Sequence, residues 1–490
     1  MRVNVAGRMP STLPADDDHP YRTGPWRPQQ TEYDADDLDV VGTIPADLDG
    51  AYLRNTENPV HDSLGHYHPF DGDGMIHMIR FADGRASYRN RFVRTLGLAA
   101  ENEAGEPLWA GLAEPPARST RDGWGARTRM KDASSTDVVV HAGVAKTSFY
   151  QCGDLYRLDP LTLETLGRET WDGRFPAEGV SAHTKVDEHT GELLFFNYST
   201  QAPYLHYGVV DAADRLVHYT PIPLPGPRLP HDMAFTERYA IVNDCPLFWD
   251  AELMAKGVYA VRFHPELPTR FGILPRRGGA ADVRWFEAAP TYVLHWINAY
   301  EDGDEVVLDG FFQHTPQPSL RGANTYYERI SRYLSLDQMQ TRAHRWRFNL
   351  ATGATREEDL SDRIMEFGMI NGRHGGRPYR YAYNMTAPTG RFLFDGLVKQ
   401  DLQTGREEHF RFGDGVFASE TPMAPRRGST GEDDGYLVTF VIDMNADRSE
   451  CWIFAAQDLQ GGPIARVRLP ERISSGTHSC WAPAETLRRA

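Results

Sequence analysis

Four histidines in separate short segments are the residues of this chain whose type and spacing point most directly to chemistry. They are His183, His231, His295 and His478, and successive members are 48, 64 and 183 positions apart. Residues typical of turns or strands flank each one. Because the separations are so large, neither a helix nor a hairpin would bring the four together. A closed fold of many strands would. Neutral imidazole nitrogens bind iron, zinc, copper or nickel, and convergence of the four would make the chain a metalloenzyme.

A single histidine is a weak sign of a metal site in this chain. The sequence has 18 histidines, and most histidines in proteins lie on the surface or are satisfied within the core. His68, His77, His141, His189 and His314 are interpreted in that ordinary way. The metal prediction for the other four therefore depends on the motifs around them.

The composition is typical of a globular protein with a large core. Of the 490 residues, 40% are apolar and 24% are charged, and the 44 glycines and 33 prolines favour many short strands joined by turns. The formal charge is −16 and no run of Lys or Arg stands out. Recognition of phosphates needs clustered cations, so no nucleic-acid partner is expected.

Cysteine usage and the absence of apolar runs bear on the compartment. Cys152, Cys245, Cys451 and Cys480 are scattered and form no C-x-x-C pair, which argues against a disulfide framework or a zinc ribbon. The N-terminus lacks the apolar stretch of about 7–15 residues that a secretory signal needs. No stretch reaches the about 18 apolar residues of a membrane-spanning helix. We expect a soluble, cytoplasmic protein; peripheral membrane contact and the oligomeric state stay open.

Short β-branched or aromatic runs alternate with turns carrying Asp, Gly or Thr-Gly from about Val40 onward. Clear examples are Ile79–Tyr88, Lys185–Phe196, Arg347–Ala354 and Lys399–Arg406. Hairpins at this spacing, without an alternating helical pattern, predict an all-β fold. Because the hairpins follow one another almost end to end, we predict a seven-bladed β-propeller. The repeats show no W-D or G-H signature, so a WD40 protein is not indicated.

Two kinds of segment lie outside the strand pattern. Residues 1–30 are polar and proline-rich, which predicts an extended or disordered N-terminal lead-in. A single propeller domain is expected over residues 31–490. Helical patterns over Asp250–Ala255 and Tyr326–Leu334 lie between strand-like regions, where they would form a helical and loop cap over a site on the propeller axis.

Several motifs occur in an order that is characteristic of one family. They are Gly42–Asn55, Asn58-Pro59, Phe70–His77, Tyr156–Pro160, Glu432–Leu437 and the four histidine segments. From about residue 38 to its end the chain resembles the carotenoid cleavage oxygenases, the non-haem iron oxygenases similar to retinal pigment epithelial membrane protein. The resemblance implies a seven-bladed propeller with one Fe(2+) held by the four histidines. It also implies a coenzyme-independent dioxygenase that cleaves a C=C double bond to carbonyl products.

The resemblance also assigns residues just outside the metal ligands. Glu366 and Glu420 match glutamates of the family that accept the imidazole N–H groups and offset the metal charge. Gln151 stands where the family usually has a third glutamate; an amide accepts the same bond but compensates less charge. Thr136 matches a residue whose methyl group lies near an open iron position.

An apolar tunnel leading to the iron is expected, with dioxygen and an apolar alkene as the partners. The residues assigned to its wall are Phe70, Leu112, Tyr150, Trp296, Phe311 and Phe312. A carotenoid or apocarotenoid is the substrate that the resemblance implies by default. The alternative is a phenylpropanoid alkene of the stilbene, isoeugenol or 4-vinylphenol type. Stilbene-cleaving relatives hold the phenol with a Lys and a Tyr, whose places are taken here by Tyr150 and Leu112, so that grip is not reproduced.

Two other classes of function are weighed against the oxygenase. A catalytically silent propeller used as a binding module predicts loss of ligand histidines, and all four are present. A zinc hydrolase would need an open three-ligand site with a general base nearby. Bound iron near one per chain would separate the oxygenase from both.

Overall fold

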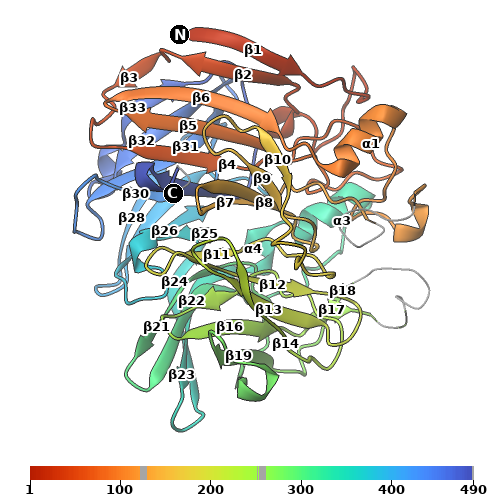
Figure 1. The fold of residues 1–490 in the computed structure, drawn as a ribbon, viewed down its shortest axis with the longest axis vertical. Coiled ribbons are helices and arrows are strands. Elements are labelled where there is room, and N and C mark those ends of the chain that lie inside the picture. The colour runs from red at the N-terminus through yellow and green to blue at the C-terminus, as the bar shows by residue number, and fades with distance from the viewer. Residues whose placement is uncertain (122–129, 251, 253–260, 488–490) are drawn as a thin grey trace. The chain divides into compact units, whose positions relative to one another are not determined.

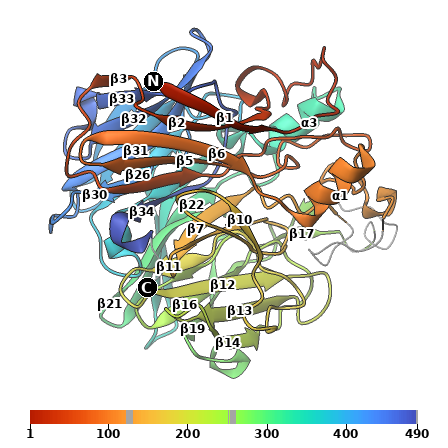
Figure 2. The same cartoon turned by 45° about the horizontal axis from the view of Figure 1, so that its top comes forward.

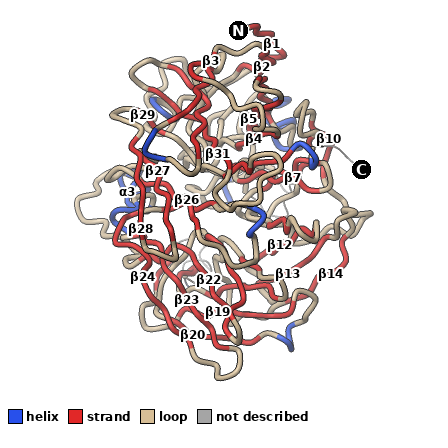
Figure 3. The backbone as a smooth tube through the Cα atoms, turned by 90° about the vertical axis from the view of Figure 1, so that its left-hand side faces the viewer, coloured by secondary structure: helices blue, strands red, loops and turns tan. Residues whose placement is uncertain are grey.

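Most regular elements of the described residues are β-strands. The structure is a computed structural model and describes residues 1–121, 130–250, 252 and 261–487. Strands dominate the described residues and only short helices lie between them (Figure 3). The chain forms two compact units: unit 1 comprises Met1–Ala182 with Phe410–Ala490, and unit 2 comprises His183–His409.

The described residues of unit 1 form three sheets. Its strands are β1 (Arg2–Arg8), β2 (Thr31–Asp36), β3 (Val40–Gly42), β4 (Gly50–Arg54), β5 (Met75–Ala82), β6 (Arg85–Phe92), β7 (Asp137–His141), β8 (Val144–Ser148), β9 (Tyr156–Leu158), β10 (Thr165–Arg168), β29 (Val416–Phe417), β30 (Met423–Pro425), β31 (Gly435–Asp443), β32 (Arg448–Ala455), β33 (Pro463–Arg468) and β34 (Ser479–Pro483). The strand orders are β1-β2-β6-β5-β4-β34, β10-β9-β8-β7 and β29-β31-β32-β33-β3, with β30 also paired to β31. Figures 1 and 2 show β2, β6 and β5 side by side in the first of these sheets. One helix of unit 1 is α1 (Leu96–Ala104).

In the part of unit 2 that the structure describes, there are four four-stranded sheets. Its strands are β11 (Lys185–Asp187), β12 (Glu192–Tyr198), β13 (Leu205–Val210), β14 (Leu216–Pro221), β15 (Ala234–Phe235), β16 (Tyr239–Asp244), β17 (Leu247–Trp249), β18 (Val261–Phe263), β19 (Thr269–Pro275), β20 (Arg284–Ala288), β21 (Trp296–Asp302), β22 (Glu305–Gln313), β23 (Thr341–Asn349), β24 (Thr355–Ile364), β25 (Glu366–Met369), β26 (Tyr381–Thr386), β27 (Gly396–Asp401) and β28 (Arg406–Arg411). The orders are β11-β12-β13-β14, β15-β16-β19-β20, β21-β22-β23-β24 and β25-β26-β27-β28, with β17-β18 as a separate pair. Three sheets in unit 1 and four in unit 2 confirm the predicted seven-bladed β-propeller fold.

The turns that the sequence indicates join consecutive strands of one sheet. β5 and β6 pair antiparallel, with Ala82 opposite Arg85. The two residues between them, Asp83 and Gly84, have φ values of +49° and +70°. A two-residue hairpin turn of type I′ has positive φ at both positions, which Asp and Gly adopt more readily than most residues. The hairpins predicted from Asp-Gly and Thr-Gly turns are confirmed.

The two ends of the chain share sheets within unit 1. β34 pairs antiparallel with β4, placing Ser479 opposite Arg54, and β3 pairs with β33. The backbone N–H of Asn55 continues the first pairing by donating to the carbonyl of His478 at 2.9 Å. This pairing fixes the approach to β34, where His478 lies.

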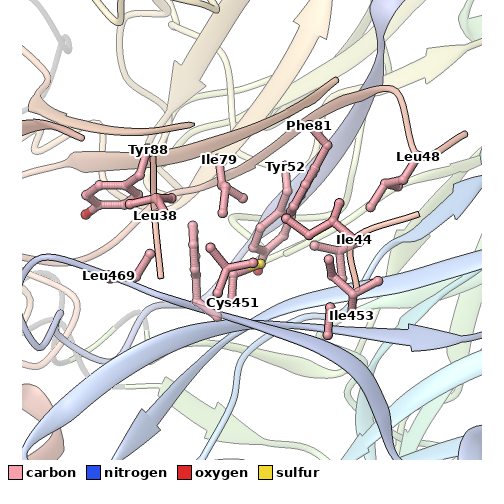
Figure 4. Packing of buried hydrophobic residues seen from close by; sticks show 14 of the residues in the cluster. Leu38, Ile44, Leu48, Tyr52, Ile79, Phe81, Tyr88, Cys451, Ile453 and Leu469 are labelled. Atoms are coloured by element: carbon pink, nitrogen blue, oxygen red, sulfur yellow. The ribbon is translucent and has the colours of Figure 1, made fainter. Parts of the chain in front are cut away.

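Both faces of β5 are buried. On β5, Ile79 and Phe81 belong to a core cluster with Tyr52 and Ile453 (Figure 4), while Ile76 and Met78 pack in a different cluster with residues of β7, β8 and β9. Alternate residues of a strand face opposite sides of a sheet. Such strands are therefore apolar on both faces, as expected for sheets stacked between neighbours.

The structure bears on three predicted segments outside the main strand pattern. The expected lead-in over residues 1–30 contains β1, which pairs with β2 at residues 31–36. The helix predicted over Tyr326–Leu334 is confirmed as α3 (Tyr326–Tyr333), and a further helix, α4 (Leu336–Met339), follows it. Most of the other predicted helix, Asp250–Ala255, lies outside the described residues. In the part of the chain that is described, no helix has the length and apolar character to cross a membrane.

Core packing in unit 2 predicts a specific loss of stability. The Phe271 ring is fully buried and its centroid lies 5.0–5.7 Å from those of Trp296, Trp346 and Phe348. Phe271→Ala should lower the free energy of unfolding by about 3–5 kcal/mol, because lost contacts and a cavity add together. Chemical denaturation followed by circular dichroism measures it. Leu267→Ala, at a side chain that is 40% exposed, is the control; equal losses in the two variants would contradict the packing.

Candidate metal centre

Three of the predicted ligands lie in unit 2, each in a loop that enters the first strand of a sheet. His183 precedes β11 by two residues, His231 precedes β15 by three, and His295 directly precedes β21. Three consecutive sheets thus carry a histidine at an equivalent place. This repetition explains how residues so distant in the sequence come together.

The three rings face one another. Nε2 of His183 lies 3.1 Å from Nε2 of His231, and the ring centroids of the trio, His295 included, are 4.8–5.1 Å apart. One ring nitrogen from each lies within 4.8 Å of the others. His183 and His295 are buried, and His231 is partly buried. Converging neutral imidazole nitrogens suit a divalent transition metal such as iron.

A buried glutamate holds the far side of one ring. Nδ1 of His295 lies 2.6 Å from Oε2 of Glu366, which is the first residue of β25 and has no exposed surface. The same carboxylate oxygen accepts the backbone N–H of Phe367 at 2.7 Å. With the carboxylate accepting from Nδ1–H, the lone pair of Nε2 is left for a metal. Glu366 therefore orients the His295 ring; its role in offsetting the charge of a bound metal stays a prediction.

Unit 1 contains the same arrangement around His478. Nδ1 of His478 lies 3.3 Å from Oε1 of Glu420, and Oε2 of Glu420 accepts the backbone N–H of Ser479 at 2.6 Å. Burial disfavours the charged imidazole, but the charge and hydrogen bond of Glu420 outweigh it and raise the pKa of His478. Glu420 thus orients the ring that directly precedes β34.

Thr136 and Gln151 both lie in unit 1. The hydroxyl of Thr136 accepts the backbone N–H of Tyr150 at 3.2 Å, and its carbonyl accepts the hydroxyl of Thr477 at 3.2 Å. Thr136 is thereby tied to the segment that carries His478. Gln151 is half-buried in the turn between β8 and β9; its role as an acceptor for an imidazole stays a prediction.

The residues assigned to a tunnel occupy two kinds of environment. Phe70, Leu112 and Tyr150 are half-buried in unit 1, and the rings of Phe70 and Tyr150 meet edge to face at 6.2 Å. In unit 2, Trp296 and Phe312 belong to one core cluster. Phe311 belongs to another, on the opposite face of β22. Packing between sheets accounts for the burial of these three rings without a tunnel.

An aromatic group beside His295 was not predicted from the sequence. The Phe367 ring lies 4.7 Å from the His295 ring, and Phe394 and Phe392 lie 4.7 and 6.1 Å from Phe367. Phe367 has a φ of +55°, a strained value for a bulky residue. Its position directly after Glu366 was the one signal in the sequence.

A carboxylate next to His231 was also missed. Asp232 is 2% exposed, and its Oδ1 lies 2.7 Å from Nζ of Lys185. Burial raises the pKa of Asp232, although the charge of Lys185 opposes the shift. Its only sequence signal was adjacency to a predicted ligand.

Comparison with known proteins points to one family. The sequence profile of the family described as retinal pigment epithelial membrane protein matches residues 26–483. The chain is 32% identical to the carotenoid 9,10(9',10')-cleavage dioxygenase 1 of Phaseolus vulgaris, covering 97% of this chain and 91% of the relative. It is 30% identical to the lignostilbene-alpha,beta-dioxygenase isozyme III of Sphingomonas paucimobilis, covering 95% and 97%. The crystal structure of Pseudomonas brassicacearum lignostilbene dioxygenase is similar at a TM-score of 0.82 and 28% identity, covering 95% and 99%.

The bond between His295 and Glu366 predicts a change in metal affinity. Glu366→Ala removes the acceptor that orients the ring, so affinity for Fe(II) should fall by about 10–100-fold. Glu366→Gln keeps an acceptor oxygen and should lose less. Metal content after competition with a chelator, under anaerobic conditions, measures both. Glu358→Ala, on the exposed part of β24, is the matched control, and wild-type affinity in Glu366→Ala would contradict the role.

Proposed function

The chain belongs to the carotenoid cleavage oxygenase family of non-haem iron oxygenases, and on this premise we propose that it cleaves a C=C double bond of a carotenoid or apocarotenoid to carbonyl products. The proposed reaction uses Fe(II) and dioxygen and needs no coenzyme. Family membership rests on a match over residues 26–483 and on relatives of 32% identity. The single observation that carries the proposal is the group of three facing imidazoles in unit 2.

We propose that the iron ligands are His183, His231, His295 and His478. The donor set fits Fe(II): the nitrogens are neutral, so a bound ion would keep its full charge, and buried carboxylates stand behind two of the rings. When bound, the iron would supply the binding and activation of dioxygen.

The side chains of the protein would orient the imidazole rings, offset the positive charge of the metal and exclude water. Glu366 and Glu420 would hold the Nδ1–H groups of His295 and His478 and offset the positive charge. Gln151 would accept a third imidazole N–H with less charge. Thr136 would restrict one approach to the iron, and Phe367 beside His295 would keep water away from it. Placement of an apolar alkene then depends on shape rather than on an acid or base.

A carotenoid or apocarotenoid is the favoured substrate because residues of a phenol-binding site are not reproduced. Where stilbene-cleaving relatives have a Lys and a Tyr, this chain has Tyr150 and Leu112. Half-buried Phe70 and Tyr150 offer aromatic faces to an apolar chain. The second candidate is a phenylpropanoid alkene of the stilbene, isoeugenol or 4-vinylphenol type. The likeness to lignostilbene dioxygenases favours it, and the Tyr150 hydroxyl would then bind the substrate phenol.

The family match runs over both compact units. We therefore propose that residues 31–490 form one catalytic domain, with α3 and neighbouring loops as its cap. The partners would be dioxygen and the apolar alkene, taken up in the cytoplasm or at the periphery of a membrane. The net charge of −16 opposes a nucleic-acid partner.

Metal content and products test the proposal together. Purified protein should contain about one iron per chain, because the four histidines would bind a single ion. Aerobic incubation with an apocarotenal should give a shorter aldehyde, identified by mass. Product from resveratrol or 4-vinylguaiacol alone would instead support the phenylpropanoid alternative.

His295→Ala should lose iron and product, whereas His189→Ala, at an exposed histidine, should keep both. Bound zinc, or no metal and no product, would contradict the oxygenase and leave a non-catalytic binding module.

A further inference from the structure

One buried carboxylate in unit 2 touches all three segments that carry its histidines. Asp232 directly follows His231. Its Oδ1 accepts from Nζ of Lys185 at 2.7 Å, and its Oδ2 accepts the backbone N–H of Trp296 at 3.0 Å. Lys185 lies two residues after His183, and Trp296 lies one residue after His295. A single side chain therefore connects the loops entering β11, β15 and β21.

Asp232 is itself held in place from two sides. Its Oδ1 also accepts the backbone N–H of Met233 at 2.7 Å. Its backbone carbonyl accepts the side-chain amide of Asn243, on β16, at 2.8 Å. With 2% of its surface exposed, the carboxylate has little freedom to change rotamer. Movement of one histidine segment would break a bond to a group that the others also use.

The backbone at His183 needs such a restraint. His183 has a φ of +64°, in the left-handed region that non-glycine residues rarely adopt. Such a conformation persists only where the surrounding structure holds it. The bond from Lys185 to Asp232 restrains the chain two residues beyond the strained position.

We propose that Asp232, together with Lys185, is a positioning residue that sets the mutual angles of the His183, His231 and His295 rings for Fe(II). The inference rests on the proposed function, since it takes Fe(II) as the ligand. A buried ion pair often adds little net stability compared with apolar packing. Its use here would be to fix geometry among three loops.

Two variants and one matched control separate positioning from general stability. Asp232→Asn removes the charge and keeps the shape, and Lys185→Met removes the partner at a half-buried position. Asp309→Asn breaks another buried ion pair of unit 2, where Arg345 binds Asp309 at 2.7 and 2.8 Å between β22 and β23. Each protein is measured by anaerobic chelator competition for Fe(II), by the visible absorption of its Co(II) form, and by thermal unfolding without metal.

We expect Asp232→Asn and Lys185→Met to weaken Fe(II) binding by about 10–100-fold and to shift the Co(II) bands. Asp309→Asn should lower the unfolding temperature but leave affinity and spectrum unchanged. Wild-type affinity and spectrum in Asp232→Asn would overturn the inference. If Asp232→Asn does not fold, unchanged values in Lys185→Met overturn it. Failure of the wild-type protein itself to bind Fe(II) would instead refute the proposed function.

Discussion

A metal-binding imidazole is held at a defined angle only if its second nitrogen is also bound, and buried carboxylates do this in both units. Glu366 has no exposed surface and Glu420 is 7% exposed. An ionised carboxylate is costly to bury unless several donors satisfy it. Each therefore receives an imidazole N–H together with a backbone N–H, from Phe367 in one case and Ser479 in the other. The need to satisfy the carboxylate thus also fixes the ring.

This demand explains why the histidines lie in loops directly beside strands. His183, His231 and His295 each lie within three residues of a first strand, and Glu366 begins the first strand of the next sheet. The strands behind them bury both faces against neighbours, as Phe311 and Phe312 do on opposite sides of β22. Tightly packed interiors deform little. A ligand placed one to three residues from such a strand inherits that stiffness.

The same features decide what the sequence can predict. Hairpins were predictable because Asp-Gly and Thr-Gly turns are local signals, and β5–β6 with Asp83-Gly84 follows the rule. The histidines were predictable because the motifs around them occur in a known order. Asp232 was not, because its role arises from contacts with Lys185 and Trp296 that join distant segments. Composition alone could not show that Phe312 is buried in a core cluster whereas Phe70 is half-buried, because that difference arises from packing between distant segments.

Unit 1 restrains the segment that carries His478 with a charge of the opposite sign. Arg54 is fully buried on β4, and its guanidinium donates to the hydroxyl of Ser419 at 3.3 Å and to the carbonyl of Ser474 at 2.7 Å. Ser419 directly precedes Glu420, and Ser474 lies four residues before His478. Burial lowers the pKa of Arg54, but a guanidinium keeps its proton in proteins. The buried cation therefore donates hydrogen bonds to neutral oxygens of the two segments that meet at the His478–Glu420 bond. Stability alone does not readily explain a buried charge at this position. The shape of the guanidinium does, because a planar group with several fixed donors can hold both segments at once.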